Sequence, residues 1–100
     1  MNELHAWLAG QHAGLRTFKT FQQKLAAFAA GHPEQRAMCR LLDAVVGRHI
    51  EEFDEAPLPS AVADRALQNL LQSVAELDDS ATPAQQLGAL NRLAELRLTA

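Results

Sequence analysis

Cysteine is almost absent from this chain, with Cys39 the only one in 100 residues. A single cysteine excludes a disulfide within the chain, and with it the disulfide framework of small secreted domains. No apolar run approaches the roughly 18 residues that a membrane-spanning helix needs. The first residues carry neither the basic segment nor the long apolar segment of a secretion signal. We therefore expect a cytoplasmic protein.

Motifs of the common catalytic and nucleotide-binding sites are also absent. The five glycines are scattered, and they form neither the phosphate-binding G-x-x-x-x-G-K loop nor the G-x-G-x-x-G turn of dinucleotide sites. The G-x-S-x-G motif of serine hydrolases and the paired Glu-x-x-His motifs of di-iron bundles are missing too. The sequence gives no positive sign of an enzyme, and we expect neither a catalytic residue nor a cofactor.

Residues that favour β-strands are few, with four Val, one Ile, four Thr and no Tyr. In contrast, 19 Ala and 16 Leu favour helices. The hydrophobic share of 48% and the charged share of 21% are ordinary for a folded domain. We predict a single helical domain over residues 1–100, all-α, built as a small antiparallel up-and-down bundle of four to five helices.

Proline, glycine and capping residues divide the chain into predicted helices. Gly10 and Gly14 weaken a helix where they stand, so the chain before residue 30 is either two helices or one bent helix. Thr82 to Gln85 has the pattern of a capping box, with Pro83 at the first helical position. The predicted helices lie near residues 3–12, 17–30, 33–55, 60–78 and 82–98.

The predicted helix 33–55 is the most clearly bounded one, because prolines stand at both of its ends. His49 is the one polar residue on its apolar face. One interpretation is a core or interface histidine whose nitrogens make hydrogen bonds. The other is a ligand or general base assisted by Glu52, three residues further on. The remaining members of this face are Met38, Leu41, Leu42, Val45, Val46 and Phe53.

The last predicted helix has an apolar arc near 200°, wider than one neighbouring helix covers. It therefore contacts two neighbours, and one of these is expected to come from another subunit. We choose Leu90, Leu93 and Leu96 as its candidate interaction residues, beside His49 and Glu52. The whole arc comprises Leu87, Ala89, Leu90, Leu93, Ala94, Leu96 and Leu98.

Charge is divided unevenly along the chain. Residues 1–50 carry six Lys or Arg and three Asp or Glu, which gives a net charge of +3. Residues 51–100 carry three Arg and nine Asp or Glu, which gives a net charge of −6. This asymmetry allows the halves to attract each other within one chain or across a dimer. Seven Arg against two Lys, with abundant Ala and Leu, indicate a GC-rich bacterial source.

Three functions remain open from these patterns. The first is a non-enzymatic protein-interaction module of a bacterial cytoplasmic protein, such as a small adaptor, regulator or chaperone-like bundle, that forms a homodimer. The second is a small-molecule or metal-binding bundle centred on His49. The third is a DNA-binding regulator with a helix-turn-helix at residues 60–98, although Arg92 and Arg97 offer little positive charge for phosphates.

Overall fold

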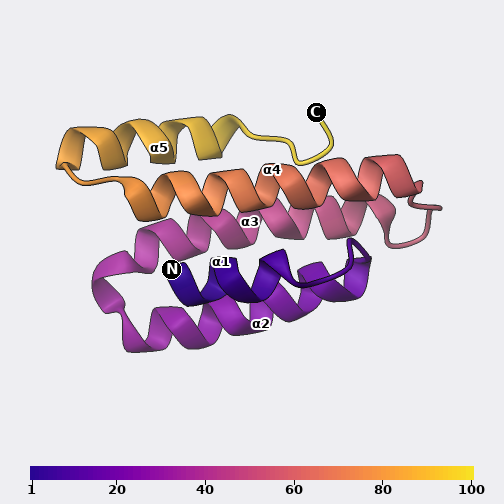
Figure 1. Ribbon diagram of the computed structural model, residues 1–100, viewed down its shortest axis with the longest axis horizontal. Coiled ribbons are helices and arrows are strands. Elements are labelled where there is room, and N and C mark those ends of the chain that lie inside the picture. Colours follow the sequence, from indigo (N-terminus) through magenta and orange to yellow (C-terminus); the bar gives the residue numbers. More distant parts are fainter.

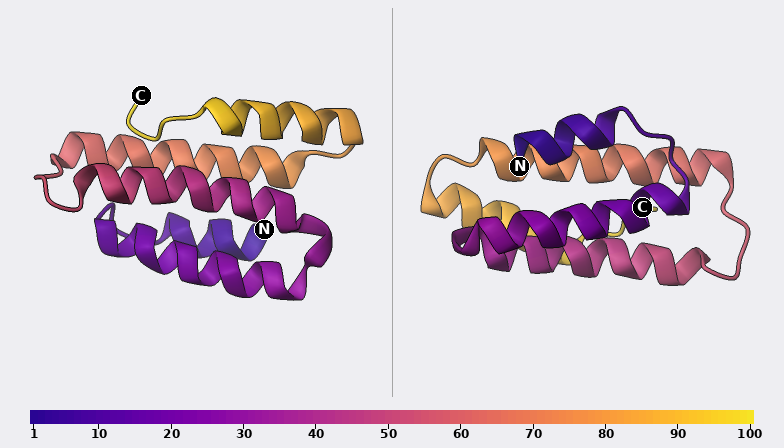
Figure 2. Two further views of the ribbon diagram at one scale, coloured as in Figure 1. Left: turned by 180° about the vertical axis from the view of Figure 1, so that it is seen from behind. Right: turned by 90° about the horizontal axis from the view of Figure 1, so that it is seen from below.

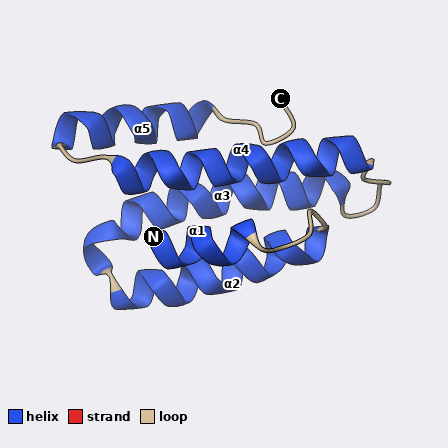
Figure 3. Cartoon of the chain, viewed as in Figure 1, coloured by secondary structure: helices blue, strands red, loops and turns tan.

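The computed structural model describes all residues 1–100 as five α-helices without a β-strand (Figure 1). This confirms the prediction of a small all-α bundle. A single 3₁₀ turn precedes the third helix, and loops make up the rest of the chain (Figure 3). The helices are α1 (Asn2–Ala9), α2 (Leu15–Gly31), α3 (Arg36–Phe53), α4 (Ser60–Asp79) and α5 (Pro83–Glu95), and the 3₁₀ turn is Pro33–Gln35.

Successive helices run in opposite directions, as the short connections predict (Figure 1). Seen from below, α1 and α4 form one layer and α2 and α3 the other (Figure 2). The backbones of α3 and α4 do not approach each other closely; instead α5 packs against both. Around the core the helices follow the order α1, α2, α3, α5, α4, and α4 then meets α1 again. The helix α5 therefore closes the bundle, and it runs parallel to α3 (Figure 1).

The chain before residue 30 forms two helices, so the alternative of one bent helix is wrong. The helix α1 ends at Ala9, and the connection through Gly10 and Gly14 turns the chain back. Thr17 steadies this turn, since its hydroxyl donates a hydrogen bond to the backbone oxygen of His12 at 2.6 Å. The break allows α1 to pack against both α2 and α4.

The last helix is shorter than predicted, because it ends at Glu95 rather than at residue 98. Leu96 leaves the helix with an extended backbone, at φ −70° and ψ 135°. The tail is then held by Asn69 of α4, whose side-chain amide donates to the backbone oxygens of Leu98 at 2.8 Å and Ala100 at 3.2 Å. This places Leu98 in the core, a position that a longer helix would not give it.

The core is one continuous apolar cluster that receives side chains from all five helices. Its fully buried members include two aromatic rings, Phe18 and Phe21 of α2. His49 is the one polar residue buried with them. No helix in the structure has both the length and the apolar character required to cross a membrane.

Candidate functional site

His49 lies in the core between two aromatic rings. The helical repeat of α3 places it on the same face as Val45, Val46 and Phe53, and its side chain is only 2% exposed. Its ring centroid is 4.5 Å from that of Phe18 on α2 and 5.3 Å from that of Phe53. Both rings are tilted to the imidazole by nearly 60°. The helices α2 and α3 thus enclose the imidazole between phenyl groups.

Neither ring nitrogen of His49 has a hydrogen-bond partner within the chain. The expectation of a buried histidine is met, but the expectation that its nitrogens make hydrogen bonds is wrong. Phe18 and Phe53 have no polar atom to offer to the imidazole. An unpaired polar group in an apolar core lowers stability by about 1–3 kcal/mol.

Glu52 is exposed and forms neither a hydrogen bond nor an ion pair with His49. Burial lowers the pKa of His49 below its ordinary value, and the negative charge of Glu52 opposes this shift without cancelling it. The imidazole is therefore neutral at neutral pH. The two residues share one end of α3 but do not form the hydrogen-bonded pair that a general base requires.

No three residues among His, Cys, Asp and Glu lie close enough together to hold a metal ion. The five principal surface clefts are not lined by His49. Cys39 is buried as well, and this burial raises the pKa of its thiol, which keeps it protonated. Cys39 also lines one of these clefts, beside Arg40 and Asp43.

The candidate residues of α5 have different environments. Leu93 is 3% exposed and belongs to the core, whereas Leu90 and Leu96 are half-buried at its edge. The two neighbours of α5 are α3 and α4 of the same chain, and they bury the part of the arc around Ala89 and Leu93 without a second subunit. Leu87, which was not chosen from the sequence, is 60% exposed and is the only large hydrophobic residue on the surface.

Leu87 belongs to an exposed stripe of α5 that carries no charge. At 100° per residue, five residues between positions 86 and 94 share the side of the helix that turns away from α4. All are exposed except Leu90, which is half-buried. We call this surface the Leu87 face; it consists of Gln86, Leu87, Leu90, Asn91 and Ala94.

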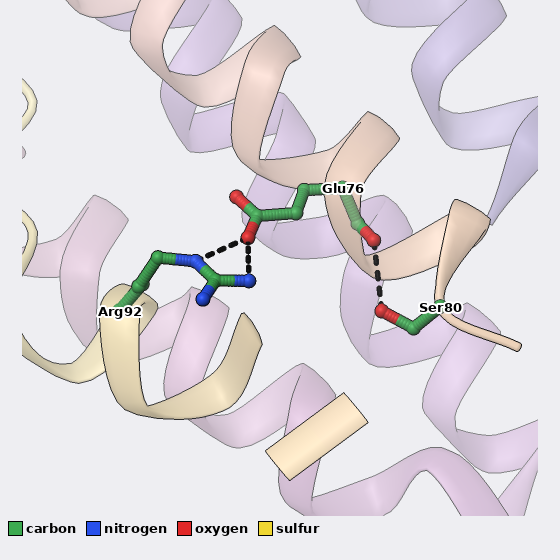
Figure 4. Close-up of polar contacts among 3 residues, drawn as sticks. All are labelled: Glu76, Ser80 and Arg92. Carbon is green, nitrogen blue, oxygen red and sulfur yellow. Dashed lines mark hydrogen bonds and ion pairs between the residues drawn. The ribbon is translucent and has the colours of Figure 1, made fainter. Parts of the chain in front are cut away.

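The opposite side of α5 is polar and meets α4 in a surface cleft. There the guanidinium of Arg92 contacts the carboxylate of Glu76 through two of its nitrogens (Figure 4). Ser80 donates a hydrogen bond from its hydroxyl to the backbone oxygen of Glu76 at 2.9 Å (Figure 4). These contacts give α5 a charged side held by its own chain and an uncharged side that is free.

The helices α4 and α5 lie side by side and antiparallel (Figures 1 and 2). The two helices of a helix-turn-helix instead cross at about 90–120°. The arrangement at residues 60–98 therefore differs from that motif.

Comparison with known protein families, with curated proteins and with solved structures gave no match to this chain.

Proposed function

We propose that this protein is a non-enzymatic protein-interaction module that forms a homodimer through the Leu87 face. The observation that carries the proposal is the 60% exposure of Leu87, in a chain that buries its other large hydrophobic side chains fully or partly. An exposed leucine flanked by half-buried Leu90 gives a partner an apolar anchor.

A second copy of the chain fits this face because of its lack of charge. In a twofold dimer each residue near the axis meets its own copy or a close neighbour. A charged residue there would face a like charge, but the Leu87 face has none. The side-chain amides of Gln86 and Asn91 both donate and accept hydrogen bonds, so each is able to pair with the corresponding amide of the partner.

The size of α5 sets the expected strength. Its 13 residues span about 20 Å, so one helix face supplies less than the roughly 800 Å² per partner of a standard interface. Full burial of one leucine side chain contributes about 1.5–3 kcal/mol. An interface below the standard size is typical of weak association, so we propose a weak dimer that dissociates in the micromolar range or above it.

The proposed setting is the bacterial cytoplasm, where the module acts as a small adaptor, regulator or chaperone-like protein. The arginine-rich and alanine-rich composition and the single buried thiol support this setting.

Replacement of Leu87 by Glu tests the proposal. Leu87→Glu places two negative charges at the dimer contact and removes its anchor, so the variant is expected to be monomeric on a sizing column with light scattering. The control is Gln68→Glu, which adds the same charge at an exposed position of α4 and leaves the dimer intact. Circular dichroism checks that both variants keep the helical content of the wild type.

A dimer of unchanged affinity in Leu87→Glu would contradict the proposal, as would equal dissociation in both variants. A wild type that is monomeric at high micromolar concentration would overturn the homodimer. The Leu87 face would then have to bind a different protein.

A further inference from the structure

His49 is the most costly residue in the core to keep in place. It is 2% exposed, it has two polar ring atoms without partners, and it is surrounded by apolar side chains. Leucine or phenylalanine at this position would bury a similar volume without an unpaired polar atom. The imidazole gives the core one property that those residues lack, which is the ability to take up a proton.

The surroundings of His49 hold no hydrogen-bond or ion-pair partner for its charged form. On α2, Lys19 follows Phe18 but is exposed, and its amino group lies 3.6 Å from the carboxylate of Asp54. On α3, exposed Glu52 attracts the proton, yet burial has the larger effect. The residues that α1, α4 and α5 bury are all apolar. An imidazolium between Phe18 and Phe53 is thus a buried charge without a partner.

The end of α3 is well placed to release such a charge. His49 lies little more than one helical turn before the end of α3 at Phe53, and the loop Asp54–Pro59 follows, exposed except for half-buried Leu58. The first part of this loop, residues 54–56, is tied back by the exposed Lys19–Asp54 pair and by one backbone hydrogen bond, from Ala56 N to the oxygen of Phe53 at 3.4 Å. Both ties are weak compared with the packed core.

We propose that His49 makes the end of α3 open in mild acid: protonation moves the ring out from between Phe18 and Phe53, and the last turn of α3 unwinds. In the open form the imidazolium reaches water and a group of carboxylates on the same segment. These carboxylates are Glu51, Glu52, Asp54 and Glu55, all exposed in the closed form. This inference does not depend on the dimer of α5.

The direction of the pH dependence follows from the lowered pKa of folded His49. The open or unfolded chain binds the proton with the ordinary pKa of about 6.5, so it holds more protons than the closed form below that pH. The closed end of α3 therefore has its full stability above about pH 6.5 and loses stability as the pH drops further. The equilibrium constant for opening rises by up to about tenfold per pH unit. The fall stops once the pH passes the pKa of the closed form.

Native-state hydrogen exchange followed by NMR tests this inference on the wild-type chain. Between pH 7 and pH 5 the protection factors of Ile50 to Phe53 are expected to fall up to about tenfold per unit below pH 6.5. Those of the α4 core, around Leu70, are expected to change less. A uniform fall in all helices, or no change at the end of α3, would overturn the inference.

Two variants separate His49 from the other histidines. His49→Leu is expected to lose the pH dependence of the protection factors in this range, and His12→Gln, a change at an exposed loop position, is expected to keep it. If His49→Leu does not fold, the imidazole proton resonances of the wild type decide the matter. Titration of the His49 ring at about pH 6.5 while the fold stays closed would contradict the proposal.

Discussion

Leu93 and Leu87 lie on the same helix in opposite environments, 3% and 60% exposed. Leu93 belongs to the central cluster, whereas Leu87 lies outside it and is largely uncovered by its own chain. The two leucines therefore have separate roles, one in folding and the other on the proposed contact surface.

Truncation of these two leucines is expected to separate folding from association. Leu93→Ala removes buried methyl groups and leaves a cavity, so it should lower the free energy of unfolding by about 2–5 kcal/mol. Leu87→Ala, at low concentration where the chain is monomeric, should change it by less than about 0.5 kcal/mol. Urea denaturation followed by circular dichroism measures both values, and similar losses in the two variants would show that Leu87 is packed.

The sequence was sufficient to identify the apolar arc of α5 but not to divide it. A helical period shows which residues share a face, and it says nothing about where the covering helices stop. Leu90, Leu93 and Leu96 were chosen together, yet only Leu93 is fully buried, and Leu87 was placed on the arc but not among the candidate interaction residues. For His49, the period predicted the apolar face correctly, but the lack of hydrogen-bond partners depends on Phe18 from another helix.

At the level of the helices, the start of α5 is the best-defined end in the chain. The hydroxyl of Thr82 accepts a hydrogen bond from Gln85 N at 3.1 Å, and the side-chain oxygen of Gln85 accepts one from Thr82 N at 3.2 Å. Pro83 occupies the first helical position, where a missing N–H costs nothing. These local contacts are readable from the sequence because they join residues only three apart. The early end of α5 was not readable, because Asn69 holds the tail from 29 residues away.

Removal of the cap is expected to weaken α5. Thr82→Ala leaves the Gln85 N–H without its acceptor, so the free energy of unfolding should fall by about 1 kcal/mol. The matched control is Thr99→Ala in the tail, outside any helix, where little change is expected. Thermal denaturation of both variants measures the effect, and an unchanged melting temperature in Thr82→Ala would contradict the role of the cap.

Gly88 offers a change in the opposite direction. It lies within α5 with an ordinary helical backbone, and an added Cβ would come no closer than 3.4 Å to the Arg92 guanidinium. Gly88→Ala should therefore raise the free energy of unfolding by up to about 1 kcal/mol through helix propensity. Urea denaturation tests this, and a loss of stability would mean that the contact of α5 with α4 leaves no room for a methyl group.

For the whole molecule, the two charged halves of the chain meet only in part. Lys19 pairs with Asp54, and the N-terminal amino group lies 3.5 Å from the carboxylate of Asp78. The third ion pair, Glu76 with Arg92, lies within the acidic half. Most charged side chains are thus solvated, and contacts within the chain do not neutralise the charge difference between its two halves. This charge difference is therefore able to attract a second copy of the chain. It is an alternative explanation for a dimer, beside the uncharged Leu87 face.

Ionic strength distinguishes these two sources. A dimer held by the Leu87 face has no charged residue at its contact, so its dissociation constant should change little between low and high salt. A dimer held by attraction between the basic and acidic halves should weaken strongly as salt shortens the reach of the charges to about 3 Å at 1 M. Light scattering at both ionic strengths provides the comparison.

Sedimentation equilibrium of the wild-type chain tests the central proposal most directly. The average mass should rise with concentration across the micromolar range, from the 10.9 kDa of one chain towards twice that value, and the data should fit a monomer–dimer equilibrium. A constant mass of 10.9 kDa at every concentration would contradict a homodimer formed through the Leu87 face.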